Sequence, residues 1–170
     1  ARQHMKHQII LASASPRRKE LLTQIGLPFT VQAACGEEKC EARLPQKQVE
    51  ELSFHTAMQI AEKTDSTAVD IGADTLLIPR DEKQATLMLK ALQGQTHQVY
   101  TGVTLIWHQG KSLRQMSFHE RTDVSVWPMT DEEIEAYVKS GEPMDKAGAY
   151  GIQGLFARFI RRIEGDYNNV

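Results

Sequence analysis

The chain has 170 residues and a net charge of −2, with 25% charged and 41% hydrophobic residues. These values are typical of one globular domain with a sizeable core. The small net charge excludes a global positive field for nucleic acid or an anionic membrane, so we expect neither as a partner. The sequence also lacks an apolar run near the ~20 residues of a transmembrane helix and the pattern of a secretory signal peptide.

The two cysteines, Cys35 and Cys40, occur without a secretion signal and therefore favour a reducing cytosol. We accordingly predict a cytoplasmic protein. The six histidines show no metal-ligand spacing, and most are interpreted as surface or satisfied residues. Residues 1–8 are interpreted as an N-terminal segment that begins like a tag remnant, and residues 9–170 as a single domain.

The stretch from Ile9 to Leu22 (IILASASPRRKELL) predicts a strand, a loop of small residues and a helix. Its apolar start is typical of a buried strand. Ser15 is a suitable N-cap, Pro16 suits the first helical position, and Gly26 ends the helix. The small residues between strand and helix let a ligand approach the backbone.

Arg17 and Arg18 stand in the first turn of this expected helix, where the macrodipole makes cations unfavourable. Free backbone N–H groups, a positive dipole end and two guanidinium groups together form a receptor for a polyanion. A solvated basic turn is the alternative. The preceding strand and the Ser-Ala-Ser loop favour phosphate binding.

Helices and strands alternate along the rest of the chain, which predicts an α/β fold with a mixed sheet. A strand is expected within 26–34, a loop over 36–43, and an amphipathic helix from about Phe54 to Lys63. Beyond it we expect strand, glycine turn and strand over 68–78, a helix at 85–92, a strand at 99–107, a hairpin at 108–112, a strand at 113–127, a helix from a Thr130–Glu133 capping box to Gly141, and a final strand at 156–163.

Three polar positions are candidates for chemistry, and each has an ordinary structural explanation. Asp74 lies inside an apolar segment, either as a turn residue beside glycine or as a carboxylate that binds metal or activates water. Glu38 belongs to a loop pair for which solvated charge is the more frequent outcome. Lys63 ends a helix, where the dipole alone favours a lysine.

Residues 145–154 (DKAGAYGIQG) contain three glycines and two alanines, which let the backbone approach a ligand closely. Tight turns alone also explain them. Lys146 supplies a cation for phosphate. The Gln153 amide donates and accepts at once, as the edge of uracil or thymine requires.

Four stretches, in order, resemble the Maf family of nucleoside triphosphate pyrophosphatases: SASPRRKELL, IGADTLL, LQGQTHQVYTGV and GEPMDKAGAYGIQG. With their flanks they cover most of the chain. The resemblance implies an elongated α/β domain of two lobes with a central cleft, and cleavage between the α- and β-phosphates of a nucleoside triphosphate. It also implies a divalent cation as cofactor, either Mg²⁺ or Mn²⁺. A homodimer agrees with the resemblance, and the family is also associated with inhibition of septum formation.

The same resemblance implies roles for individual residues. Asp74 would be the proton acceptor, and Glu38 and Asp74 would hold the metal. The form YGIQG resembles the branch of the family that acts on dTTP and UTP. Substrate-binding residues would be Ser13, Arg17, Arg18, Lys63, Thr75, Lys146 and Gln153, of which Arg17, Thr75 and Gln153 match positions linked to substrate choice.

The sequence departs from the family pattern in two places. Ile78 runs directly into Pro79, without the family's small hairpin ending in Lys-Pro, and the sequence stops at Val170, where the family continues. Each departure is either a deletion or a segment outside this sequence. The alternatives are a purine-directed pyrophosphatase of the 7-methyl-GTP type and a catalytically silent nucleotide-binding regulator of septum formation.

Overall fold

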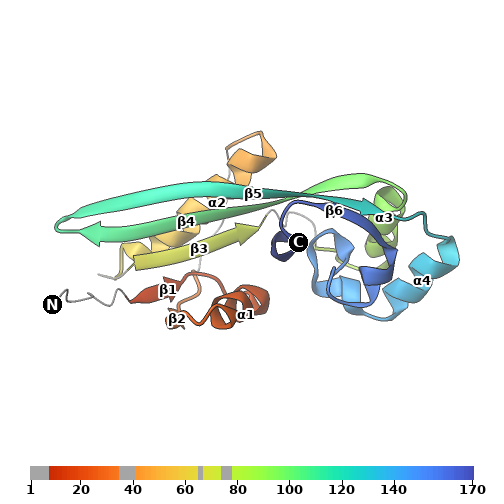
Figure 1. The fold of residues 1–170 in the computed structure, drawn as a ribbon, viewed down its shortest axis with the longest axis horizontal. Helices are drawn as coiled ribbons and strands as arrows, with labels where there is room; N and C mark the ends of the chain where they lie inside the picture. The colour runs from red at the N-terminus through yellow and green to blue at the C-terminus, as the bar shows by residue number, and fades with distance from the viewer. Residues whose placement is uncertain (1–7, 35–40, 65–66, 74–77) are drawn as a thin grey trace. The chain divides into compact units, whose positions relative to one another are not determined.

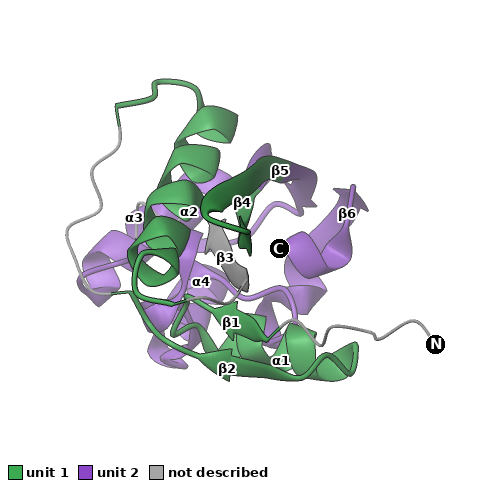
Figure 2. Cartoon of the chain, turned by 90° about the vertical axis from the view of Figure 1, so that its left-hand side faces the viewer, with its two compact units in different colours: residues 1–73, 101–119 green, residues 74–100, 120–170 purple. Residues whose placement is uncertain are grey.

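The computed structural model describes residues 8–34, 41–64, 67–73 and 78–170, with the backbone alone for 67–73. The chain divides into two compact units, drawn in different colours in Figure 2. Unit 1 comprises residues 1–73 and 101–119, and unit 2 comprises residues 74–100 and 120–170. Each unit has its own cluster of buried apolar side chains.

Unit 1 begins with β1 (Ile9–Leu11), α1 (Pro16–Gln24), β2 (Phe29–Val31), α2 (Pro45–Ala61) and β3 (Thr67–Ala73), as Figure 1 shows. The strand β1 pairs in parallel with both β2 and β3, with Ile9 opposite Phe29 on one side and Thr67 on the other. The strand β3 pairs antiparallel with β4 (Thr96–Gln109). The predicted α/β fold with a mixed sheet is confirmed.

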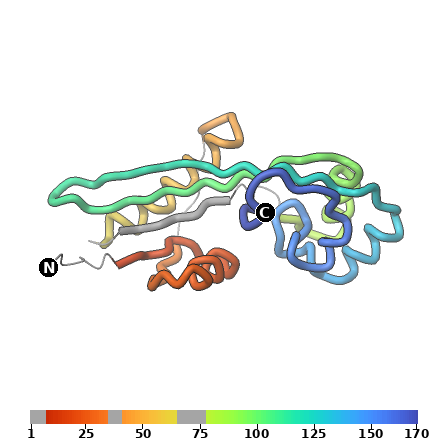
Figure 3. Tube along the Cα trace, in the orientation of Figure 1, coloured from red at the N-terminus to blue at the C-terminus, as the bar shows by residue number. Residues whose placement is uncertain are grey.

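The two longest strands, β4 and β5 (Ser112–Val126), are joined by Gly110 and Lys111, as the tube in Figure 3 traces. Gly110 has a φ of 63°, a left-handed conformation that glycine adopts without strain. The predicted hairpin at this place is confirmed. The strand order of the sheet is β2-β1-β3-β4-β5-β6, in which β6 (Ile160–Glu164) pairs antiparallel with β5.

The core of unit 1 forms where α2 packs on the sheet. Close approach depends on Gly102, because a Cβ there would lie 2.0 Å from the carbonyl oxygen of Val49. Two buried hydroxyls also meet across this contact, since Ser53 Oγ lies 2.8 Å from Thr104 Oγ1. The buried apolar members of this core are Ile10, Ala12, Ala57, Ile60, Ala61 and Ile106.

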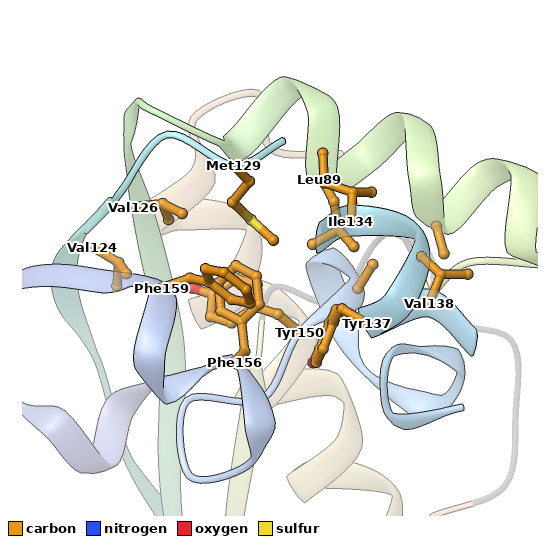
Figure 4. Close-up of a cluster of buried hydrophobic side chains, with 12 residues drawn as sticks. Leu89, Val124, Val126, Met129, Ile134, Tyr137, Val138, Tyr150, Phe156 and Phe159 are labelled. Atoms are coloured by element: carbon orange, nitrogen blue, oxygen red, sulfur yellow. The ribbon is translucent and has the colours of Figure 1, made fainter. Parts of the chain in front are cut away.

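The described part of unit 2 contains α3 (Glu82–Leu92), α4 (Asp131–Lys139), β6 and four short 3₁₀ segments. Phe156 is fully buried, and its ring lies 5.1 Å from that of Tyr137 and 4.8 Å from that of Tyr150 (Figure 4). The 3₁₀ segments are η1 (Glu142–Asp145), η2 (Ala147–Ala149), η3 (Leu155–Phe159) and η4 (Tyr167–Asn169).

Side-chain caps open both long helices of unit 2. Asp81 Oδ1 accepts a hydrogen bond from the backbone N–H of Gln84 at 2.7 Å. Thr130 Oγ1 accepts one from the backbone N–H of Glu133 at 3.2 Å, the first half of the predicted capping box. No helix in the described part of the chain combines the length and apolar character needed to cross a bilayer.

Three sequence-based predictions need correction. The helix α2 begins at Pro45, well before Phe54, because its buried stripe already includes Val49 and Leu52. The strand β3 runs on through Gly72 without the predicted turn, since Gly72 pairs directly with Gly102 of β4. The predicted final strand starts only at Ile160, and the residues before it form η3.

Candidate functional site

Ser13 anchors the loop between β1 and α1. Its side chain is buried, and its Oγ accepts hydrogen bonds from Arg18 Nη1 at 2.7 Å and from the backbone N–H of Ser15 at 3.2 Å. Ser15 is the N-cap residue by position, but within the described chain its side chain makes no capping hydrogen bond to α1. The structure therefore brings two predicted site residues, Ser13 and Arg18, into direct contact.

The first turn of α1 carries cations and no acidic residue. Arg17 is partly exposed, and its Nη1 lies 3.6 Å from Glu20 Oε2. An exposed pair at that distance contributes little to stability. The positive end of the helix dipole opposes the arginines by about 0.3–1 kcal/mol each, so the local electrostatics favour an incoming anion.

Lys63 follows α2 and is exposed, and its backbone N–H donates to the carbonyl of Ile60 at 3.0 Å. This confirms the predicted place at a helix end. Glu38, Asp74 and Thr75 lie outside the described residues. Among the described residues no group of three or more His, Cys, Asp or Glu is placed to hold a metal ion.

In unit 2, Lys146 lies beside the glycine-rich segment. Its Nζ donates to Asp145 Oδ1 at 2.9 Å and to the carbonyl of Glu142 at 3.1 Å. The hydrogen bond from Lys146 lowers the pKa of the Asp145 carboxyl. The lysine stem also covers Gly151, where a Cβ would lie 2.7 Å from Lys146 Cε.

Gln153 lies in a tight turn that closes on itself. The backbone N–H of Gly154 donates to the carbonyl of Gly151 at 3.2 Å, as in a β-turn. Ile152 is buried with 3% exposure, whereas Gln153 is exposed. Because Ile152 faces the core and Gln153 faces outward, the Gln153 amide is presented to solvent.

Two further residues hold this turn, Tyr137 and Glu142, and neither is a candidate from the sequence. The Tyr137 hydroxyl donates to Glu142 Oε1 at 2.9 Å and accepts from the backbone N–H of Gly151 at 3.3 Å. Glu142 Oε2 accepts from the backbone N–H of Leu155 at 3.0 Å. Burial, and then the hydrogen bond to Glu142, raise the pKa of Tyr137 well above its ordinary value.

His97 and Tyr150 form a second polar pair in unit 2. His97 Nε2 lies 2.6 Å from the Tyr150 hydroxyl, and the two rings meet edge to face. Burial lowers the pKa of His97 and raises the pKa of Tyr150. His97 Nδ1 is buried and has no hydrogen-bond partner within the described chain, so His97 is not one of the fully satisfied histidines expected from the sequence.

Residues 148 and 149 both adopt left-handed conformations, with φ of 70° at Gly148 and 65° at Ala149. Ala149 is fully buried in the core of unit 2. A left-handed alanine costs roughly 1–2 kcal/mol, which the surrounding packing must offset. The segment before the Gln153 turn is thus fixed by packing as well as by hydrogen bonds.

Comparison with known proteins matches residues 8–170 to the family described as Maf-like protein. The chain belongs to the Maf-like protein family. It is 47% identical to the dTTP/UTP pyrophosphatase of Agathobacter rectalis over 96% of this chain and 90% of that protein. The proteins of the same name from Lachnoclostridium phytofermentans and Bacillus pumilus are 45% and 44% identical, each over 96% of this chain and over 88% and 89% of their own lengths.

Among solved structures, the Ham1 protein of Staphylococcus aureus is similar with a TM-score of 0.45 and 11% sequence identity. The similarity covers 70% of this chain and 71% of that chain.

Proposed function

We propose that this protein is a nucleoside triphosphate pyrophosphatase that hydrolyses dTTP and UTP to the nucleoside monophosphate and pyrophosphate. The observation that carries the proposal is the 44–47% identity to proteins named dTTP/UTP pyrophosphatase, over 96% of this chain. Hydrolysis of the α–β anhydride consumes one water and would remove surplus or non-standard nucleotides from a cytoplasmic pool.

The arrangement around α1 supports the phosphate-binding part of the proposal. Arg17 and Arg18 stand at the positive end of the helix, and Ser13 fixes one guanidinium at 2.7 Å. A triphosphate would supply the negative charge that this helix start lacks. Lys63 and Lys146 would add further cations.

Asp74 would accept the proton of the attacking water. Together with Glu38 it would hold Mg²⁺ or Mn²⁺, because carboxylate oxygens are the ligands that these cations prefer. When bound, the cation offsets the charge on the phosphate oxygens during cleavage. This donor chemistry suits such a cation, and chelation with EDTA should therefore abolish turnover.

Gln153 and Thr75 would select the base. The Gln153 amide can donate to a carbonyl of uracil or thymine while it accepts from the ring N–H. Another base carries a different pattern of donors and acceptors on this edge, or holds the edge at a different distance from the ribose. Such a base would leave a polar atom of the site unpaired, at a cost of about 1–3 kcal/mol. The exposure of Gln153 supports this role.

The test is pyrophosphate release from dTTP, UTP, CTP, GTP and 7-methyl-GTP on one preparation with Mg²⁺ or Mn²⁺. We expect dTTP and UTP to give the highest kcat/KM. A guanine nucleotide at the top would establish the purine-directed alternative. Binding without turnover of any nucleotide would instead support the silent regulator of septum formation.

Size-exclusion chromatography with light scattering tests the homodimer, which the resemblance to the family suggests. The proposal includes no nucleic-acid or membrane partner, in keeping with the net charge of −2.

A further inference from the structure

The direction of the Gln153 amide depends on the turn that carries it. This turn runs from Gly151 to Gly154, with Ile152 buried beneath it and Gln153 exposed. Its own hydrogen bond, Gly154 N–H to the Gly151 carbonyl, fixes its shape but not its position. The position must come from contacts with the rest of unit 2.

Two side chains supply these contacts, and we call Tyr137 and Glu142 the tyrosine–glutamate clamp. The Tyr137 hydroxyl holds the first residue of the turn through the N–H of Gly151 at 3.3 Å. The Glu142 carboxylate holds the residue after the turn through the N–H of Leu155 at 3.0 Å. A third hydrogen bond, of 2.9 Å, joins the hydroxyl to the carboxylate and makes the clamp one unit.

The turn is shaped to receive this carboxylate. A Cβ on Gly154 would lie 2.3 Å from Glu142 Oε1 and 2.5 Å from Oε2, so the carboxylate occupies the space of a side chain. Gly154 has a φ of −104°, which any residue adopts, and so close approach is the reason for glycine here. Gly154 thus lies against the Glu142 carboxylate of the clamp, and Gly151, at the other end of the turn, lies against the Lys146 side chain.

The clamp is rigid because its tyrosine belongs to the core. Tyr137 is 3% exposed and packs against Phe156, whose ring is visible beside it in Figure 4. Charge-assisted hydrogen bonds to the carboxylate add strength in this partly buried setting. A displacement of the turn would break several of these bonds together.

We propose that Tyr137 and Glu142 are positioning residues for base selection, which act through Gln153. This inference rests on the proposed function, in which Gln153 reads the base. A purine carries its hydrogen-bonding edge further from the ribose than a pyrimidine does. A turn held in one place therefore accepts the shorter base, and a loosened turn accepts both.

The test compares kcat/KM for UTP and GTP, which share the ribose and the triphosphate. Tyr137→Phe keeps the ring and removes the hydroxyl, so we expect the UTP:GTP ratio to fall about threefold to tenfold, the value of one hydrogen bond. The fall in the ratio should come mainly from a higher KM for UTP. Glu142→Ala should lower the ratio further, and Glu142→Gln should restore part of it because one amide oxygen can still accept from Leu155.

Matched controls are Tyr167→Phe and Glu135→Gln. Tyr167 is 45% exposed, and Glu135 forms an exposed ion pair with Lys139 on α4. Both should keep the native ratio. Amide hydrogen exchange at Gly151 and Leu155 provides a readout without turnover, and we expect it to be faster in Tyr137→Phe and Glu142→Ala at an unchanged global fold by circular dichroism.

Combination with Gln153→Ala separates a positioning role from a general effect. If the clamp acts through Gln153, Tyr137→Phe should cause no further change of the ratio in the Gln153→Ala background. An unchanged ratio in Tyr137→Phe, while Gln153→Ala alters it, would overturn the clamp and leave the proposed function intact. An unchanged ratio in Gln153→Ala would overturn both the base reader and the clamp, and absence of turnover in the native protein would overturn the pyrophosphatase itself.

Discussion

The start of α1 and the turn around Gln153 hold their proposed ligand groups in different ways. At α1, the Arg18 guanidinium donates a hydrogen bond to the buried Ser13 hydroxyl, and the Arg17 side chain remains 39% exposed. Around Gln153, three linked hydrogen bonds and a glycine pressed against a carboxylate fix the backbone. The contact at α1 therefore holds a charged side chain, whereas the contacts around Gln153 hold the backbone.

The difference follows from what each group would recognise. The attraction between a guanidinium and a triphosphate falls slowly with distance, so small displacements of the arginines change it little. A hydrogen bond from an amide weakens steeply outside about 2.7–3.2 Å. Precision is thus concentrated in the region that would read the base, and net charge in the region that would hold the phosphates.

The largest expected effect belongs to neither region. Asp74→Asn keeps the shape of the side chain and removes the proposed base and metal charge. We expect kcat to fall by roughly 100-fold or more, while base preference in the residual activity stays native. Single-turnover kinetics measure this, with Asp131→Asn, an exposed position, as the control. Unchanged turnover in a folded Asp74→Asn protein would refute its proposed role.

Arg17→Ala and Arg18→Ala test the charged region. Loss of a charge-assisted hydrogen bond of 1.5–3 kcal/mol should weaken triphosphate binding by about tenfold to 150-fold, equally for UTP and GTP. The melting temperature should not fall in Arg17→Ala, because cations at a helix start do not favour the fold, whereas Arg18→Ala also loses the hydrogen bond to buried Ser13 and should melt slightly earlier. Titration calorimetry and thermal melting check both points, with exposed Lys19→Ala as control. A variant that binds normally but melts early would make the arginine structural.

Local signals made the charged region predictable from sequence. The strand, the loop and α1 follow one another within residues 9–24. Each has a short-range signal in the sequence: the apolar run of β1, the small residues of the loop and Pro16 at the helix start. The clamp was not predictable in the same way. Glu142 and Leu155 are separated by 13 residues with no periodic pattern, and Tyr137 already had a sufficient explanation as a buried helix residue.

The wrong prediction before β6 has a similar origin. Phe156 and Phe159 are both large and apolar, which favours a strand when composition alone is considered. Their separation by three positions fits a 3₁₀ turn better than the two-residue period of a strand, and both are buried in η3. The glycines at 151 and 154 are the one sequence signal for the clamp. A glycine that allows close approach to the backbone implies that another group of the protein or a ligand lies against it.

Gln153→Glu tests the region that would read the base. The change keeps the size and removes the amide donor, so we expect the UTP:GTP ratio of kcat/KM to fall about fivefold to 100-fold. Triphosphate affinity should change much less than in Arg17→Ala. Gln115→Glu, at an exposed position of β5, is the matched control. A native ratio in Gln153→Glu would assign base reading to another residue.

The smallest effect concerns the pH dependence of stability and arises at His97 in unit 2. Burial lowers the pKa of His97, so the folded protein holds it neutral, whereas the unfolded chain binds a proton below about pH 6.5. Stability from this group is therefore present above pH 6.5 and is lost as pH falls, by at most about 1.4 kcal/mol per pH unit.

Denaturant unfolding at pH 7.5 and pH 5.5 measures this loss. His97→Gln should reduce the difference between the two values, whereas His55→Gln, at an exposed position of α2, should leave it unchanged. An identical pH dependence in native and His97→Gln proteins would show that other groups account for it.

The left-handed Ala149 has a consequence for how related sequences vary. Replacement by glycine would relieve roughly 1–2 kcal/mol of backbone strain but remove a buried methyl worth about 0.8 kcal/mol and add unfolded-state entropy worth about 0.4–1 kcal/mol. These contributions nearly cancel, and full burial excludes any larger side chain. Position 149 should therefore drift between alanine and glycine during evolution without selection, so that a pattern of two small residues there reports the geometry of the backbone and carries no information about substrate.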